Sequence, residues 1–173
     1  MQATPKQAEI RLTLAELYSR ADLFDPAIGQ FDAWIDAHPD DNRMATALNG
    51  RCWARALINR DLNQALSDCN AAVRMAPHQA NPLDSRGLIR LRRGEFDRAI
   101  ADYDAALAIA PKTAWSLYGR GVAKLKTGKT AEGEADLAAA KAIAPHLAER
   151  AAKLGVTPPS AAAAATMATP AKS

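Results

Sequence analysis

The sequence predicts an all-α protein: a solenoid of stacked helical hairpins, closed at its C-terminal end by one further helix. Three prolines stand 34 residues apart, and each ends one copy of a common pattern: Pro77, Pro111 and Pro145. Each copy has a small residue twelve positions before its proline and an alanine five positions before it: Ala65 and Ala72, Ala99 and Ala106, Gly133 and Ala140. A fixed period of this length is typical of arrays in which each unit buries its apolar face against its neighbours.

The first hairpin is predicted over residues 8–41, after an N-terminal extension over residues 1–7. Its second helix repeats the internal spacing of the later copies, with Ala27, Phe31, Trp34 and Pro39 at the matching positions. The pair Asp25-Pro26 is expected to open that helix, because proline is favoured in a first helical turn. Since Pro39 lies 38 residues before Pro77 rather than 34, four extra residues are assigned to a longer turn over 40–45.

The second hairpin is predicted over residues 46–79. Its first helix is expected from Ala47 to Ile58 and its second helix ends at Met75. Between them, the segment Asp61-Leu62-Asn63-Gln64 has the spacing of a capping box, in which two side chains satisfy free N–H groups of the first turn.

The third and fourth hairpins, over residues 80–113 and 114–145, share one plan. In the third, Asn81 is the expected N-cap and Pro82 takes the first helical position. Gly94 ends the first helix of this hairpin after Arg92. The expected helices of these two hairpins then run over 82–92, 96–109, 115–126 and 131–143, with apolar residues at three- and four-residue steps.

The C-terminal part is predicted to contain one closing helix and a tail. Residues 146–154 are amphipathic, and a stacked array needs such a helix because its last repeat would otherwise expose an apolar face. Gly155 ends this helix. Residues 155–173 are rich in alanine and proline, have no means of burying a core, and are expected to be disordered.

Composition restricts the class of function. The 173 residues are 49% hydrophobic and 24% charged, as in one soluble globular domain. The net charge is +3, and the basic and acidic residues are interleaved along the chain. The sequence contains no run of basic residues that would indicate nucleic-acid binding, and no apolar stretch that is long enough to span a membrane. The first ten residues lack a secretory signal. Two locations stay open: the cytoplasm, or the periplasm or exterior if Met1 precedes the processed end of a secreted chain.

Cys52 and Cys69 are the only cysteines, one on each predicted helix of the second hairpin. Their separation is half a repeat, so the hairpin could bring them face to face. Two interpretations stay open: a disulfide, which would indicate an oxidising compartment, and two buried thiols that act as small hydrophobic residues.

The charged residues also follow the period. Asp68, Asp102 and Asp136 recur every 34 residues, and Arg86 and Arg120 are likewise one repeat apart. A ladder of Arg–Asp pairs between adjacent helices is the favoured interpretation, and an anion or acidic-peptide site is the alternative.

The sequence contains no predicted catalytic or metal site. The three histidines (His38, His78 and His146) adjoin repeat-closing prolines and are expected to be solvated turn residues. No phosphate-binding loop, nucleophile elbow or metal-ligand spacing is present. No enzymatic activity, metal or cofactor is therefore expected.

These spacings resemble the tetratricopeptide repeat family over about residues 8–154. The third hairpin matches its pattern nearly everywhere, with Gly87, Gly94, Phe96, Ala99, Tyr103, Ala106 and Pro111. The second departs from it, with Trp53, Arg60 and Cys69 in place of a small residue, a glycine and an aromatic residue. The resemblance implies a right-handed superhelical solenoid whose first helices line a concave groove that receives a peptide or helix of a partner protein. The bias toward alanine and arginine suits a bacterial protein.

The register of the repeats predicts which residues line that groove in the C-terminal half: Leu88, Leu91, Arg92, Trp115, Tyr118, Val122 and Lys126. Trp115 and Tyr118 are three residues apart and share a helix face, so with Leu88 and Leu91 they could form an aromatic and aliphatic pocket. The alternative is that the closing helix or the tail covers them. Two functions are considered. The favoured one is a protein-interaction module that captures its partner in the groove. The alternative is a structural subunit that self-associates through Trp34 and Trp53, and the sequence does not fix the oligomeric state.

Overall fold

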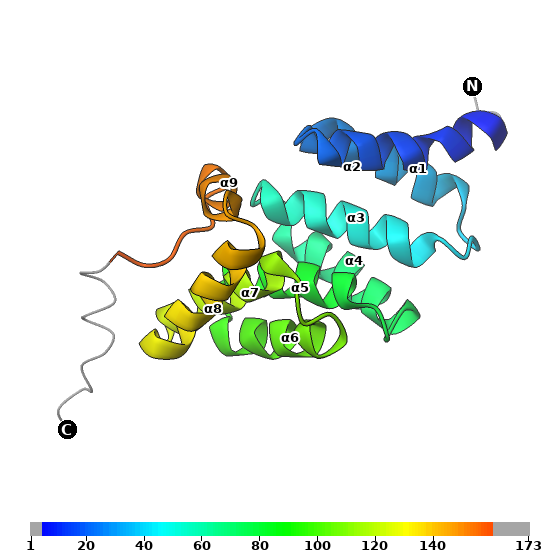
Figure 1. Ribbon diagram of the computed structural model, residues 1–173. Coiled ribbons are helices and arrows are strands. Elements are labelled where there is room, and N and C mark those ends of the chain that lie inside the picture. Colours follow the sequence, from blue (N-terminus) through cyan, green and yellow to red (C-terminus); the bar gives the residue numbers. More distant parts are fainter. Residues whose placement is uncertain (1–4, 161–173) are drawn as a thin grey trace.

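The computed structural model describes residues 5–160 of the chain (Figure 1). Within that range it contains nine α-helices and no strand. They are α1 (Pro5–Arg20), α2 (Phe24–Ala37), α3 (Met44–Leu57), α4 (Leu62–Met75), α5 (Ala80–Arg92), α6 (Phe96–Ile109), α7 (Ala114–Lys126), α8 (Thr130–Ile143) and α9 (Leu147–Lys153).

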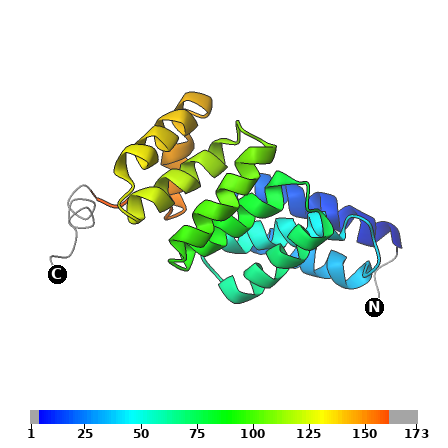
Figure 2. The ribbon, with the colours of Figure 1, turned by 90° about the horizontal axis from the view of Figure 1, so that it is seen from below.

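The helices form four stacked hairpins and a closing helix. Each second helix (α2, α4 and α6) packs against the first helix of the next hairpin, and α1, α3, α5 and α7 contact one another in order. The last helix, α9, packs on α7 and α8. Figures 1 and 2 show the first hairpin and α8 at opposite ends of the array. The prediction of an all-α solenoid with a closing helix is confirmed.

The helix ends show where local sequence signals mislead. Helix α6 has the predicted bounds, whereas α5 begins at Ala80, so Asn81 lies inside the first turn and is not the N-cap. The capping box is also wrong: Asp61 has a left-handed backbone conformation, and its side chain makes no capping hydrogen bond. Helix α3 begins at Met44, so part of the four-residue insertion is helical rather than an extended turn. Helix α1 begins at Pro5, inside the expected N-terminal extension.

Tyr103 is one of the largest fully buried side chains of residues 5–160, and glycines on both sides make room for it. It is buried on α6 between Gly87 of α5 and Gly119 of α7. A Cβ atom added at Gly87 would lie 2.8 Å from a ring carbon of Tyr103, and one at Gly119 would overlap the ring still more. The absence of side chains at these two positions therefore sets the spacing of the third and fourth hairpins.

We expect the substitution Gly119→Ala to lower the free energy of unfolding by about 1–3 kcal/mol, because the added methyl group would overpack the Tyr103 ring. Urea denaturation followed by circular dichroism measures the change. Gly29→Ala is the matched control, since no atom lies within 4 Å of the Cβ atom it would add. The control should raise stability by about 0.5–1 kcal/mol through helix propensity. A stabilised Gly119→Ala variant would contradict the packing described here.

Candidate functional site

The groove predicted in the C-terminal half is largely covered. Four of its seven predicted residues are buried, among them Tyr118, which is 4% exposed: Leu88, Leu91, Tyr118 and Val122. The closing helix and the residues that follow it pack over this part of the first helices. The C-terminal segment covers part of the expected aromatic and aliphatic pocket, and a smaller cavity of about 200 Å³ remains there, lined in part by Leu91, Arg92, Val122 and Lys126.

Arg92 and Tyr118 hold the covering segment through its backbone. The Arg92 guanidinium donates hydrogen bonds to the carbonyl groups of Leu154 and Gly155, and also to those of Ala56 and Leu57 at the end of α3. The Tyr118 hydroxyl donates to the carbonyl oxygen of Val156 at 3.1 Å. Burial lowers the pKa of Arg92 from its usual value.

The start of the tail is therefore ordered, contrary to prediction. Val156 is 4% exposed and belongs to the main hydrophobic core, although the disordered tail was expected from residue 155. Residues 161–173 of that predicted tail lie outside the part that the structure describes. On the other side of α9, Arg150 forms a 2.6 Å ion pair with Asp22 in the turn between α1 and α2.

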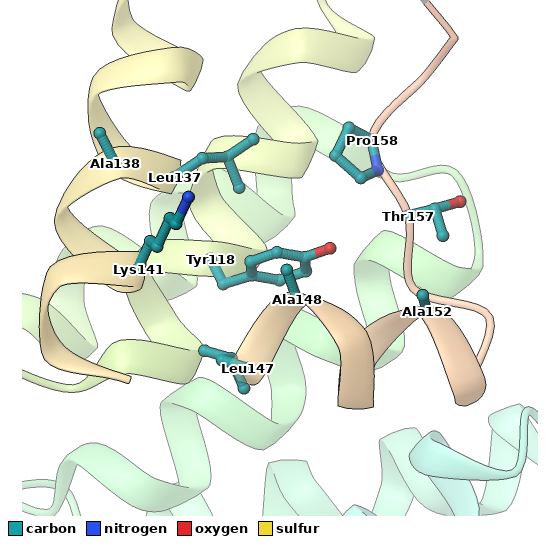
Figure 3. Close-up of a pocket in the computed structure, with 9 residues that line it drawn as sticks. All are labelled: Tyr118, Leu137, Ala138, Lys141, Leu147, Ala148, Ala152, Thr157 and Pro158. Carbon is teal, nitrogen blue, oxygen red and sulfur yellow. The ribbon is translucent and has the colours of Figure 1, made fainter. Parts of the chain in front are cut away.

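An apolar cavity of about 350 Å³ lies between α8, α9 and the segment after α9. Figure 3 shows Tyr118 at its centre, Leu137 and Lys141 on α8, Leu147 and Ala148 on α9, and Pro158 on the following segment. None of its lining residues comes from α1, α3 or α5. Of the predicted groove residues, Tyr118 alone is among those that line it.

The larger open part of the first-helix face extends from the first hairpin to the start of the fourth. Two cavities of about 330 and 280 Å³ adjoin there, and they share Asn49, Trp53 and Asn81. We call the two cavities together the first-helix groove. The first cavity is also lined by Glu16, Ser19, Arg20, Phe31, Thr46 and Gly50, and the second by Asp84, Ser85, Thr113 and Trp115.

Aromatic side chains line the middle of the first-helix groove. The rings of Trp53 and Trp115 lie 5.5 Å apart at 85°, and Trp115 in turn contacts Tyr118 edge-on at 6.3 Å. Both tryptophans are half-buried. Large aromatic side chains that keep an exposed face are common anchors at protein interfaces.

Polar groups accompany these rings. The side-chain oxygens Ser19 Oγ and Asn49 Oδ1 are buried and have no hydrogen-bond partner within residues 5–160. Both residues line the 330 Å³ cavity. Buried polar atoms normally find partners, so these two oxygens are available to a bound polar group such as a peptide backbone.

Trp115 was placed in the groove from sequence, but Trp53, Asn49 and Asn81 were not. Asn49 and Trp53 are four residues apart on α3 and share a face, which is the signal that could have found them. Trp53 was instead read as a departure from the repeat pattern.

The comparisons with known proteins agree with this architecture. Residues 87–128 match the family model described as TPR repeat. This chain has the fold of a tetratricopeptide repeat (TPR) solenoid. A comparison with curated protein sequences finds no match.

Solved structures share the TPR fold at low sequence identity. A thermophilic TPR protein in Thermus thermophilus is 18% identical with a TM-score of 0.70, over 86% of this chain and 84% of that chain. A crystal structure of MamA protein is 22% identical with a TM-score of 0.64, over 84% and 77%. MamA from Desulfovibrio magneticus RS-1 is 17% identical with a TM-score of 0.64, over 95% and 93%. At such identities the likeness concerns the fold alone.

A ladder of ion pairs joins the helices of the TPR array. Each repeated aspartate contacts an arginine on the first helix of its own hairpin: Arg51–Asp68 at 2.6 Å, Arg86–Asp102 at 2.7 Å and Arg120–Asp136 at 2.6 Å. A second cation, four residues further along, contacts the same aspartate: Arg55, Arg90 and Lys124. The predicted ladder is confirmed, and these aspartates and arginines are already paired rather than free to form an anion site.

The same arginines also reach the preceding hairpin. Arg51 contacts Asp32 at 2.8 Å, and Arg120 contacts Asp104 at 2.7 Å. Burial acts to raise the pKa of Asp136, but hydrogen bonds from Arg120 and Lys124 outweigh it and hold that pKa below its usual value. The ladder thus connects neighbouring TPR units as well as the two helices of each.

The two cysteines of the second TPR form a disulfide between α3 and α4. The sequence left open a disulfide or two free thiols, and the structure contains the disulfide between Cys52 and Cys69. It lies in the hydrophobic core beside Ala65 and Leu57 and away from solvent.

The histidines differ in their surroundings. His78 and His146 are exposed, as expected. His38 is not a solvated turn residue: its ring stacks on Trp34 with centroids 4.6 Å apart, and Nδ1 lies 2.8 Å from the Trp34 carbonyl oxygen. Trp34 itself is fully buried, so it offers no surface for self-association.

Within residues 5–160, no cluster of three or more histidine, cysteine, aspartate or glutamate side chains could hold a metal ion. None of the helices in that range is long and apolar enough to cross a membrane.

Asp84 lines the groove and is buried, and no cationic side chain in the described part of the chain forms an ion pair with it. Burial raises its pKa from 3.8 to about 6, and a hydrogen bond from Ser116 Oγ at 2.5 Å offsets this only in part. Ionised Asp84 is therefore less stable in the folded protein than in the unfolded chain. The ionisation of Asp84 therefore lowers the free energy of unfolding. This loss is absent below pH 3.8, the pKa of Asp84 in the unfolded chain, grows as the pH rises toward 6, and is constant above pH 6.

We expect Asp84→Asn to raise the free energy of unfolding by up to ~3 kcal/mol at pH 7, since it removes this penalty. The gain should shrink as the pH falls from 7 toward 4. Urea denaturation at several pH values measures it. The control Asp97→Asn, at an exposed position on α6, should leave the pH dependence unchanged. A destabilised Asp84→Asn variant at pH 7 would refute this account of Asp84.

Proposed function

We propose that this protein binds a partner protein by capturing a peptide or helix of that partner in the first-helix groove. The observation that carries the proposal is the pair of adjoining cavities that share Asn49, Trp53 and Asn81. A groove of this kind offers aromatic surface for apolar side chains of the partner. It also offers amide groups and unpaired oxygens for the partner's backbone.

The location of the groove also supports the proposal. In the C-terminal half of the first-helix face, α9 and residues 154–156 leave a cavity of only about 200 Å³, whereas the two cavities of the first-helix groove measure about 330 and 280 Å³. The role proposed is binding rather than catalysis, because within residues 5–160 no serine or threonine that lines the groove pairs with a histidine or carboxylate as a general base.

The test is affinity capture from native lysate with the wild-type protein and a Trp53→Ala, Trp115→Ala double variant. A matched control is Leu23→Ala, Ile109→Ala, which removes two exposed apolar side chains outside the groove. A partner retained by wild type and control but lost by the folded groove variant supports the proposal. A partner retained equally by all three proteins contradicts it.

Self-association is the second candidate function, with the protein as a structural subunit. Trp53 is half-buried and lines the groove, so a second copy could occupy the same surface that a partner would use. Sedimentation velocity over a range of concentrations separates the two, because capture of a partner requires no change of mass with concentration.

The disulfide supports an oxidising compartment, such as the periplasm or the cell exterior, over the reducing cytoplasm. Alkylation of rapidly quenched cells tests this. Unmodified Cys52 and Cys69 would support an oxidising location, and full modification after denaturation would indicate the cytoplasm.

A further inference from the structure

The 280 Å³ cavity at the Trp115 end of the first-helix groove has an uncommon set of lining groups. Of the described residues that line it, the one with a charged side chain is Asp84, and the indole rings of Trp53 and Trp115 line it as well. The remaining lining residues are neutral and polar: Asn49, Asn81, Ser85 and Thr113. Among residues 5–160, no lysine, arginine or histidine lines this cavity.

Asp84 differs from the other buried aspartates of the array. It is 9% exposed, and one carboxylate oxygen accepts the hydrogen bond from Ser116. Asp68, Asp102 and Asp136 each contact two cationic side chains, whereas no cation within residues 5–160 forms an ion pair with Asp84. A buried carboxylate is normally matched by a positive charge, so Asp84 lacks the partner that its equivalents have.

The indole rings provide the second independent feature. Trp53 and Trp115 are nearly perpendicular, so they form two walls of a corner next to the carboxylate. The face of an indole ring carries partial negative charge and attracts cations within about 6 Å. Carboxylate and rings thus favour the same kind of ligand.

We propose that this cavity binds a basic side chain, the ammonium of lysine or the guanidinium of arginine, from the peptide held in the groove. This inference rests on the proposed function and specifies the partner's chemistry. The ammonium or guanidinium would pair with Asp84, and its aliphatic stem would lie against Trp53 and Trp115. A peptide with an acidic or phosphorylated residue at this position is disfavoured, because Asp84 would repel it.

Small probes test the site without the partner. The full-length protein is titrated with Nα-acetyl-lysine amide and Nα-acetyl-arginine amide, and with their uncharged counterparts Nε-acetyl-lysine and citrulline amides. Binding is followed through the NMR signals of the tryptophan indole N–H groups. We expect at least one charged probe to shift the Trp53 and Trp115 signals with roughly tenfold higher affinity than its uncharged counterpart.

Asp84→Asn keeps the shape of the side chain and should abolish the preference for the charged probe, while the control Asp97→Asn should retain it. The inference is overturned if neither charged probe exceeds its neutral counterpart, or if the Asp84→Asn protein keeps the preference.

These results are distinguishable from failure of the proposed function. If the probes show no charge preference but the groove variant still loses its partner, the groove binds a partner of other chemistry. If a charged probe binds but the groove variant retains its partner, the cation site stands and groove capture fails.

Discussion

Replacing Asp102 with asparagine is expected to lower the free energy of unfolding by about 2–4 kcal/mol. Asp102 is 3% exposed and accepts hydrogen bonds from both Nε and Nη2 of Arg86, while Arg90 contacts its Oδ2 atom at 2.8 Å. The neutral amide would leave two partly buried guanidinium groups without their counter-charge. The expected loss is somewhat below that of a fully buried pair, because both arginines keep some exposure to water.

Urea denaturation at neutral pH measures this loss. Asp104→Asn is the matched control, since Asp104 lies two residues along the same helix and pairs with Arg120 from an exposed position. Such surface pairs contribute about 0–1 kcal/mol. Equal effects of the two substitutions would contradict the distinction drawn here between the buried ladder and its exposed contacts.

Removing the disulfide is expected to have the second-largest effect. The double variant Cys52→Ala, Cys69→Ala should lower the free energy of unfolding by about 3 kcal/mol, because the cross-link restricts the unfolded chain across a separation of 17 residues. Reduction of the wild-type protein should have a similar effect, since the same constraint is lost.

The comparison is made by urea denaturation of oxidised wild type, reduced wild type and the double variant. Reductant should leave the double variant unchanged, which controls for other effects of the reagent. If both thiols of purified, unreduced protein alkylate after denaturation, the cross-link is absent and this prediction fails.

Much of the fold could be predicted because the sequence contains a repeated pattern. The 34-residue period fixes which residues face the core, so the bounds of α6 and the pairing of Arg86 with Asp102 follow from register alone. Helix starts were less predictable. At Asp61 and Asn81 the local capping signal competes with the packing of the hairpins, and the packing determines the backbone.

The candidate site was predicted only in part, for a related reason. Trp115 could be placed in the groove by register, but the covering of Tyr118 depends on residues 154–156, which are distant in sequence. Arg92 donates to Gly155, 63 residues away, and no repeat pattern specifies such a contact. An alanine- and proline-rich composition indicates disorder on average and cannot show that Val156 has a core position to fill.

The most direct test of the proposed groove is site-specific photo-crosslinking in cells. A benzoylphenylalanine residue is placed at Asn81, an exposed position that lines both cavities, or at Ala105, an exposed position on α6. The account predicts a crosslinked partner from position 81, and none from position 105. Crosslinking of the same partner from position 105 alone would contradict groove capture and place the binding surface on the second helices.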